Sequence, residues 1–171
     1  MPAFLNTLYG LSKKLTTCIS IVTTACLLVI NPGFAADPAP VSKSKNGFAI
    51  GSHDSVAYHS LSRDPHAEAS PGNKTWAVEY LGAEWHFATK ENADLFRANP
   101  EKYKPAYNGH CANALSIGNG LVVTDGKVWE IFGDQLFLFF AERGRARWLS
   151  ADDIGPYKAA ADAEWKKLSQ Q

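Results

Sequence analysis

Two pairs of short segments with alternating residues constrain the fold of this chain more than any other feature. The segment TWAVEY (75–80) places Trp76, Val78 and Tyr80 on one face of a strand, and EWHF (84–87) follows after the turn LGA. Two alternating segments around a short turn predict a β-hairpin. The aromatic side chains of this hairpin are expected to lie in the core, and His86 is expected on the opposite, at least partly exposed face.

A second hairpin is predicted over residues 127–132 and 135–140, KVWEIF and QLFLFF, which are joined by Gly-Asp. Glycine at the first of two turn positions is typical of a type II′ hairpin turn. Apolar residues occupy both faces of the second strand, so both faces are expected to be covered. On this reading Phe140 shares a covered face with Leu136 and Leu138.

Three helices complete the predicted fold. Thr89 is suited to cap a helix over 90–99, in which Leu95 and Phe96 are expected to point inward. A connector with proline at either end, PEKYKPAY, leads to a second predicted helix over 109–118. The order of these elements, with a helical tail, predicts an α+β domain: a small antiparallel sheet built from two hairpins and packed with three to five short helices. In the tail over 151–168, the spacing of Tyr157, Ala161 and Trp165 predicts one packing face.

The N-terminus has the layout of a secretory signal peptide. Lys13 and Lys14 precede an uncharged apolar run over 15–30, and small residues surround a cleavage position after Ala35. An uncleaved membrane anchor is the alternative, although the run is shorter than the roughly 20 residues that usually span a bilayer. We therefore expect a signal peptide at 1–35, a flexible linker at 36–46, a domain at 47–168, a periplasmic or secreted location, and no membrane span after cleavage.

The charge of the remaining chain excludes one class of function. Without the two leader lysines, 15 basic and 17 acidic residues remain, a formal charge near −2. This balance lacks the basic surface of a nucleic-acid-binding domain. Three arginines do cluster in ERGRARW (142–148), where a solvated helix face and a contact with phosphate or anionic lipid both stay open.

Cysteine usage sharpens the chemical question. Cys18 and Cys26 lie in the leader, so Cys111 is the one thiol left after cleavage. No internal disulfide can form, and the domain depends on its hydrophobic core. In an oxidising compartment a single thiol is buried, bound to a metal, reactive or paired with another molecule.

A longer pattern resembles a known family. The run EWHFATKENADLFRANPEKYKPAYNGHCANAL, with DQLFLFF and ADAEWKKL further along, resembles exported YHS domain proteins. The resemblance implies a small binding module related to metal-handling domains of the TRASH type. Metal-binding versions carry two cysteines where this chain has Ala88 and Asn92, and neither residue is a thiolate ligand. A cysteine-based site of that kind is therefore not expected here.

The remaining metal hypothesis uses the single thiol. Copper or zinc would suit a thiolate with imidazoles, which gives Cys111, His110, His59 and His86 as candidate ligands. The alternative is a structural or protein-interaction domain in which Cys111 is buried and inert, as free cysteine often is. A thiol-dependent enzyme is a third interpretation, and no recognisable catalytic motif supports it. The expected partner is a metal ion or another periplasmic protein.

Overall fold

The computed structural model describes residues 40–61 and 67–169 of the chain. Within these residues it has two separate two-stranded antiparallel sheets, five α-helices and three short 3-10 helices. The α+β prediction is confirmed. The two predicted hairpins form as expected, but each remains its own sheet. The elements are η1 (Ile50–Ser52), η2 (Ala57–Ser60), β1 (Asn73–Tyr80), β2 (Ala83–Phe87), α1 (Lys90–Ala98), α2 (Pro100–Tyr103), η3 (Ala106–Gly109), α3 (Ala112–Ser116), β3 (Val128–Phe132), β4 (Gln135–Phe139), α4 (Glu142–Leu149) and α5 (Gly155–Leu168).

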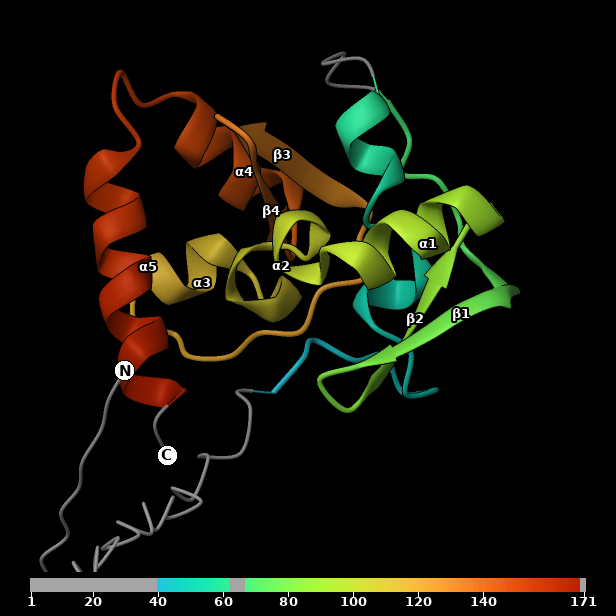
Figure 1. Ribbon diagram of the computed structural model, residues 1–171. Helices are drawn as coiled ribbons and strands as arrows, with labels where there is room; N and C mark the ends of the chain where they lie inside the picture. The colour runs from blue at the N-terminus through green and yellow to red at the C-terminus, as the bar shows by residue number, and fades with distance from the viewer. Residues whose placement is uncertain (1–39, 62–66, 170–171) are drawn as a thin grey trace, which may run out of the picture. The chain divides into compact units, whose positions relative to one another are not determined.

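Strand β4 lies between two hydrophobic clusters and contributes to both. Leu136 and Leu138 belong to a cluster with the β1–β2 hairpin and α1. Phe137 and Phe139 face a second cluster with α3, α4 and α5. Figure 1 shows the β1–β2 hairpin with α1 on one side of this strand and α5 with α3 on the other. Both faces of β4 are therefore covered, as its apolar pattern predicts.

The pattern fails at the end of this strand. Phe140, predicted to share the covered face of Leu136 and Leu138, is 67% exposed. Strand β4 ends at Phe139, so the alternation of faces does not extend to the next residue. Leu95 is a similar exception, because it is 46% exposed while its neighbour Phe96 is fully buried in the first cluster.

Side-chain caps fix the starts of the helical segments near the first hairpin. The hydroxyl oxygen of Thr89 accepts a hydrogen bond from the backbone N–H of Asn92 at 3.1 Å, which confirms the predicted cap of α1. Asp54 caps the turn before η2 in the same way, by accepting the N–H groups of Val56 and Ala57. Such caps satisfy N–H groups that have no partner within the helix.

The segment predicted as a connector and a ten-residue helix is organised differently. Residues 100–109 form α2 and η3, and α3 is confined to Ala112–Ser116. The reason lies at Gly109, whose φ is +85° and where a Cβ atom would come within 2.5 Å of the Ile50 side chain. A helix cannot pass through a residue in that conformation. The chain therefore bends at Gly109 and restarts as a helix after Cys111.

The start of the described chain is packed against the domain. Val41 and Ser42, which the sequence assigns to the linker, are buried. Ser42 accepts a hydrogen bond from Ile50 N–H and donates its own N–H to Asn108. The predicted signal peptide lies outside the described residues. In the part of the chain that the structure describes, the helices are too short or too polar to cross a membrane.

Candidate functional site

Cys111 has its sulfur atom enclosed by backbone groups. Its side chain is 3% exposed, and Sγ accepts the N–H groups of Ala114 at 3.4 Å and Phe140 at 3.2 Å. Cys111 is thus the N-cap of α3 and also ties this helix to the residue that follows β4. The geometry agrees with the interpretation of a buried, structural cysteine.

His110 is buried beside Cys111 but has its own partners. Its Nδ1 lies 3.0 Å from the backbone oxygen of Tyr107, and its ring packs 6.0 Å from the ring of Trp165. Burial lowers the pKa of His110, and the contact with the Tyr107 carbonyl opposes this effect. The imidazole is therefore neutral at pH 7, and Nδ1–H donates to that carbonyl.

His86 is buried, which corrects the prediction that it lies on an exposed face. Phe48 packs over its ring at 4.4 Å and covers the side of the hairpin that the alternation leaves polar. Its Nδ1 lies 2.6 Å from the hydroxyl of Ser52, and its Nε2 lies 2.6 Å from a carboxylate oxygen of Glu84. Both ring nitrogens therefore have a partner within the protein.

His59 differs from these two histidines. Its Nε2 atom is buried and has no hydrogen-bond partner among the described residues. The ring packs edge-on against Tyr103, with the centroids 5.6 Å apart. Burial lowers the pKa of His59, the Lys102 ammonium lowers it further, and the carboxylate of Asp134 acts in the opposite direction.

The four residues do not form one metal centre. Among the described residues, no three or more histidine, cysteine, aspartate or glutamate side chains form a group that could hold a metal ion. Cys111 and His110 adjoin each other, whereas His86 is bonded to Ser52 and His59 packs on Tyr103. Most of the sulfur and nitrogen atoms proposed as metal ligands already take part in hydrogen bonds within the protein.

Ala88 and Asn92, the positions at which the resemblance implies cysteines in metal-binding versions, take part in a hydrogen-bond network instead. The backbone N–H of Ala88 and the side-chain amide of Asn92 both donate to Oδ2 of Asp54, each at 2.7 Å. Oδ1 of the same carboxylate accepts the N–H groups of Val56 and Ala57. A fully buried carboxylate that accepts four hydrogen bonds has its oxygen atoms committed to protein donors. These residues do not fit a thiolate metal site.

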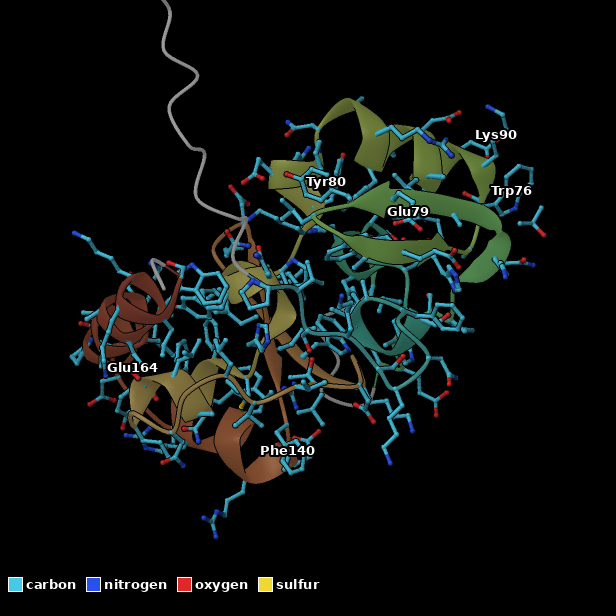
Figure 2. All side chains as sticks on the ribbon, turned by 90° about the horizontal axis from the view of Figure 1, so that it is seen from below. Trp76, Glu79, Tyr80, Lys90, Phe140 and Glu164 are labelled. Atoms are coloured by element: carbon cyan, nitrogen blue, oxygen red, sulfur yellow. The ribbon has the colours of Figure 1, made fainter. Side chains whose placement is uncertain are left out.

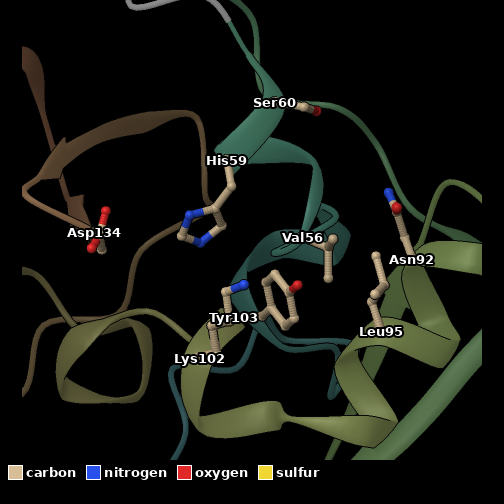
Figure 3. A pocket seen from close by; sticks show the side chains of 8 residues that line it. All are labelled: Val56, His59, Ser60, Asn92, Leu95, Lys102, Tyr103 and Asp134. Atoms are coloured by element: carbon tan, nitrogen blue, oxygen red, sulfur yellow. The ribbon is translucent and has the colours of Figure 1, made fainter.

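A cavity of about 640 Å³ opens beside His59, and we call it the His59 pocket. In Figure 3 the imidazole lies between Asp134 on one side and Lys102 with Tyr103 on the other, and Leu95 lies beyond Tyr103. The pocket is lined by Val56, His59, Ser60, Asn92, Leu95, Lys102, Tyr103 and Asp134.

Three of the lining residues carry no functional expectation in the sequence. Lys102 and Tyr103 belong to α2, in the segment taken for a connector, and Asp134 belongs to the β3–β4 turn. Elements that are distant in sequence bring them together, so no local spacing signals the pocket. The local signs of this helix are Asn99, whose side chain caps α2, and the proline at the first position of α2.

Comparison with known proteins gives one finding. Residues 69–107 match the family model described as YHS domain. The match begins shortly before β1, includes β2, α1 and α2, and ends before Cys111. No curated protein and no solved structure matches the chain. The matched segment supports a YHS domain within this chain.

Proposed function

We propose that this chain is an exported binding module that takes a small organic acid into the His59 pocket. One observation carries the proposal: the buried Nε2 atom of His59, beside a cavity, has no hydrogen-bond partner among the described residues. A buried polar atom without a hydrogen-bond partner costs about 1–3 kcal/mol of stability. Such an atom beside a cavity therefore suggests a ligand that supplies the missing hydrogen bond.

The charges around this ring favour an anion. Apart from burial, the larger effect on the pKa of His59 comes from Lys102, and the smaller, opposite effect from Asp134. Of the two charged groups, the Lys102 ammonium therefore has the larger influence on the ring. The Lys102 ammonium has no carboxylate partner among the described residues, and it lies 4.9 Å above the Tyr103 ring. A bound carboxylate would pair with this ammonium and accept a hydrogen bond from the imidazole.

The other walls of the pocket favour an apolar body on the ligand. Val56, Leu95 and the ring of Tyr103 line the cavity together with its charged groups. Pockets for small molecules combine apolar walls with a few polar groups that orient the ligand. The partly exposed side chain of Leu95, which the internal core does not use, contributes to such a wall. An aromatic or branched aliphatic carboxylic acid matches this lining.

Benzoate is a suitable probe. We expect it to bind the purified protein with a Kd of about 1 mM, the affinity typical of a ligand with about ten non-hydrogen atoms. Binding should shift the NMR signals of the His59 ring nitrogens, while benzylamine, of the same size but positively charged, should not. Lys102→Met should weaken benzoate binding at least tenfold, and Lys166→Met serves as the matched control. Equal binding of both probes, or an unaffected Lys102→Met variant, would contradict the proposal.

Copper or zinc handling at Cys111 is the competing function, and the same protein tests it. Cu(I) or Zn²⁺ is added to the reduced protein and to Cys111→Ala. Because Sγ already accepts two N–H groups, we expect the two proteins to take up equal, small amounts of metal. A loss of uptake in Cys111→Ala would favour the metal-handling function instead.

Export rests on the N-terminal sequence. Expression of the full chain in a bacterium with a secretory pathway should yield a periplasmic or secreted product, and cleavage after Ala35 would make Ala36 its first residue. Intact-mass measurement checks this point. A product that keeps residues 1–35 and sediments with membranes would support the membrane-anchor alternative.

A further inference from the structure

A second surface, which shares no lining residue with the His59 pocket, exposes apolar side chains between two hollows. Phe140 is 67% exposed, Ile117 is 50% exposed and Val123 is 46% exposed. Figure 2 shows Phe140 projecting at the edge of the domain, away from the labelled residues of the β1–β2 hairpin. Cavities of about 560 and 530 Å³ share Phe140 as a lining residue. Ile117 lines the first cavity and Val123 the second, so Phe140 forms a ridge between two partly apolar hollows.

The side chain of Phe140 belongs to neither hydrophobic cluster of the described residues. Its backbone N–H donates to Sγ of Cys111, which fixes the position of this residue after the strand. Its side chain leaves the core at the point where β4 ends and α4 is about to begin. An exposed phenylalanine forgoes the stabilisation that burial of so large an apolar side chain gives. Large exposed side chains that gather around hollows mark interaction sites.

Unpaired cations flank the ridge. Arg143 lines one hollow and Lys45 the other, and neither has an ion-pair partner among the described residues. By contrast, Arg145 is paired with Glu130 at 2.9 Å, and Arg147 donates to Asn113. Two of the three arginines of ERGRARW therefore stabilise the fold, and only Arg143 is available at the surface.

The remaining charged groups of the hollows leave this positive balance in place. Lys43 lines the hollow of Lys45 and donates to the backbone oxygen of Gly82. The one carboxylate there, Asp125, lies 3.7 Å from the ammonium of Lys127. We define the Phe140 surface as Phe140, Ile117, Val123, Lys45 and Arg143. It is apolar at its centre and positively charged at its two ends.

We propose that the Phe140 surface docks an acidic segment of another protein, which places one apolar side chain in each hollow and its carboxylates against Arg143 and Lys45. The charge of the surface selects a negatively charged partner. The two hollows on either side of a ridge suit separate side chains of a peptide, whereas a lipid bilayer presents a flat, continuous surface. An aromatic centre with charged residues around it is also the usual composition of a protein-binding site.

Selection from a phage library of random 12-residue peptides tests this proposal, and a fluorescent copy of a selected peptide gives its Kd by anisotropy. We expect selected peptides rich in Asp and Glu with two spaced apolar residues. Their affinity should fall at least tenfold for Phe140→Ser and for Arg143→Glu, and should fall with rising salt. Leu149→Ser, which removes an exposed apolar side chain of α4 that lines neither hollow, is the matched control.

Both surface variants should keep the unfolding midpoint of the wild type, because the altered side chains are exposed. Three outcomes would overturn the proposal: no enrichment, enriched peptides without acidic residues, or equal binding to Phe140→Ser. A separate binding assay offers the protein vesicles of phosphatidylcholine and phosphatidylglycerol at 3:1. Phe140-dependent binding to these vesicles without peptide enrichment would assign the surface to membranes instead.

Discussion

The side-chain amide of Asn92 donates a hydrogen bond of 2.7 Å to the carboxylate of Asp54, 38 residues earlier in the chain. Ala88 N–H reaches the same oxygen atom at the same distance. The family resemblance implies that metal-binding versions carry cysteines at the positions of Ala88 and Asn92. Here the buried carboxylate of Asp54 joins these positions to the turn before η2. Hydrogen bonds within the protein therefore connect the segments around Ala88 and Asn92, without a metal ion.

Loss of the Asp54 carboxylate should destabilise the domain strongly. Asp54→Ala leaves three backbone N–H groups and the Asn92 amide without their acceptor, and we expect a loss of about 3 kcal/mol or more in the free energy of unfolding. Asn92→Ala removes one donor and should cost about 1 kcal/mol. Urea unfolding of both variants measures the difference. Equal losses would show that the carboxylate does not organise this junction.

A thiolate site should be restorable at the same two positions. Ala88 and Asn92 are the two positions at which the family resemblance places cysteine ligands, so the double variant Ala88→Cys/Asn92→Cys should supply two thiolates, a ligand type that suits zinc. We expect Zn²⁺ to bind the double variant at least 100-fold more tightly than the wild type, measured by competition with a chromophoric chelator. Each single variant is a control. Similar affinities for all four proteins would refute the prediction.

Local patterns in the sequence predict the parts of this fold that depend on neighbouring residues. Alternation gives both hairpins, and the capping role of Thr89 follows from a short polar side chain before an apolar segment. The spacing of Tyr157, Ala161 and Trp165 likewise predicts the buried face of α5. In each case the deciding interactions lie within a few residues of one another.

The errors arise where distant segments meet. His86 is buried because Phe48 and Ser52, more than thirty residues away, cover and bond its ring. The His59 pocket combines η2, α1, α2 and a hairpin turn. Periodicity describes a single element and cannot indicate which other element covers its polar face. Gly109 is an intermediate case, because glycine signals conformational freedom without revealing which contact demands it.

Gly109 should tolerate substitution far less than another glycine with a similar backbone. Gly109 and Gly118 both have positive φ, but only at Gly109 would a Cβ atom clash, at 2.5 Å from Ile50. Gly118→Ala should cost about 1 kcal/mol for the left-handed conformation alone. Gly109→Ala should cost about 3 kcal/mol because overpacking adds to this strain. Thermal or urea unfolding of the pair separates the two effects, and equal costs would argue against the close packing of Gly109 on η1.

Stability should fall as the pH decreases from 7 to 5. Burial lowers the pKa values of His110 and His59 below the unfolded value of 6.5. Groups with a lowered folded pKa contribute stability that is fully present above the unfolded pKa and is lost as the pH falls through the folded pKa. His110→Asn retains a side-chain donor for the Tyr107 carbonyl but does not titrate, so its free energy of unfolding should vary less with pH in this range. If the free energy of unfolding of His110→Asn varied with pH as steeply as that of the wild type, His110 would not be a source of the pH dependence.

The thiol of Cys111 should react slowly in the folded protein. A thiol reagent needs access to Sγ, but this atom lies in a side chain that is 3% exposed and accepts N–H groups of Ala114 and Phe140. With Ellman's reagent at neutral pH we expect labelling at least 100-fold slower than in 6 M guanidinium, with a rate that rises as denaturant populates opened states. Phe140→Ser is an informative control, because it changes the side chain beside the sulfur but keeps the N–H that bonds it. Fast labelling of the folded wild type would instead indicate a reactive cysteine, and the structural role assigned to Cys111 would then be wrong.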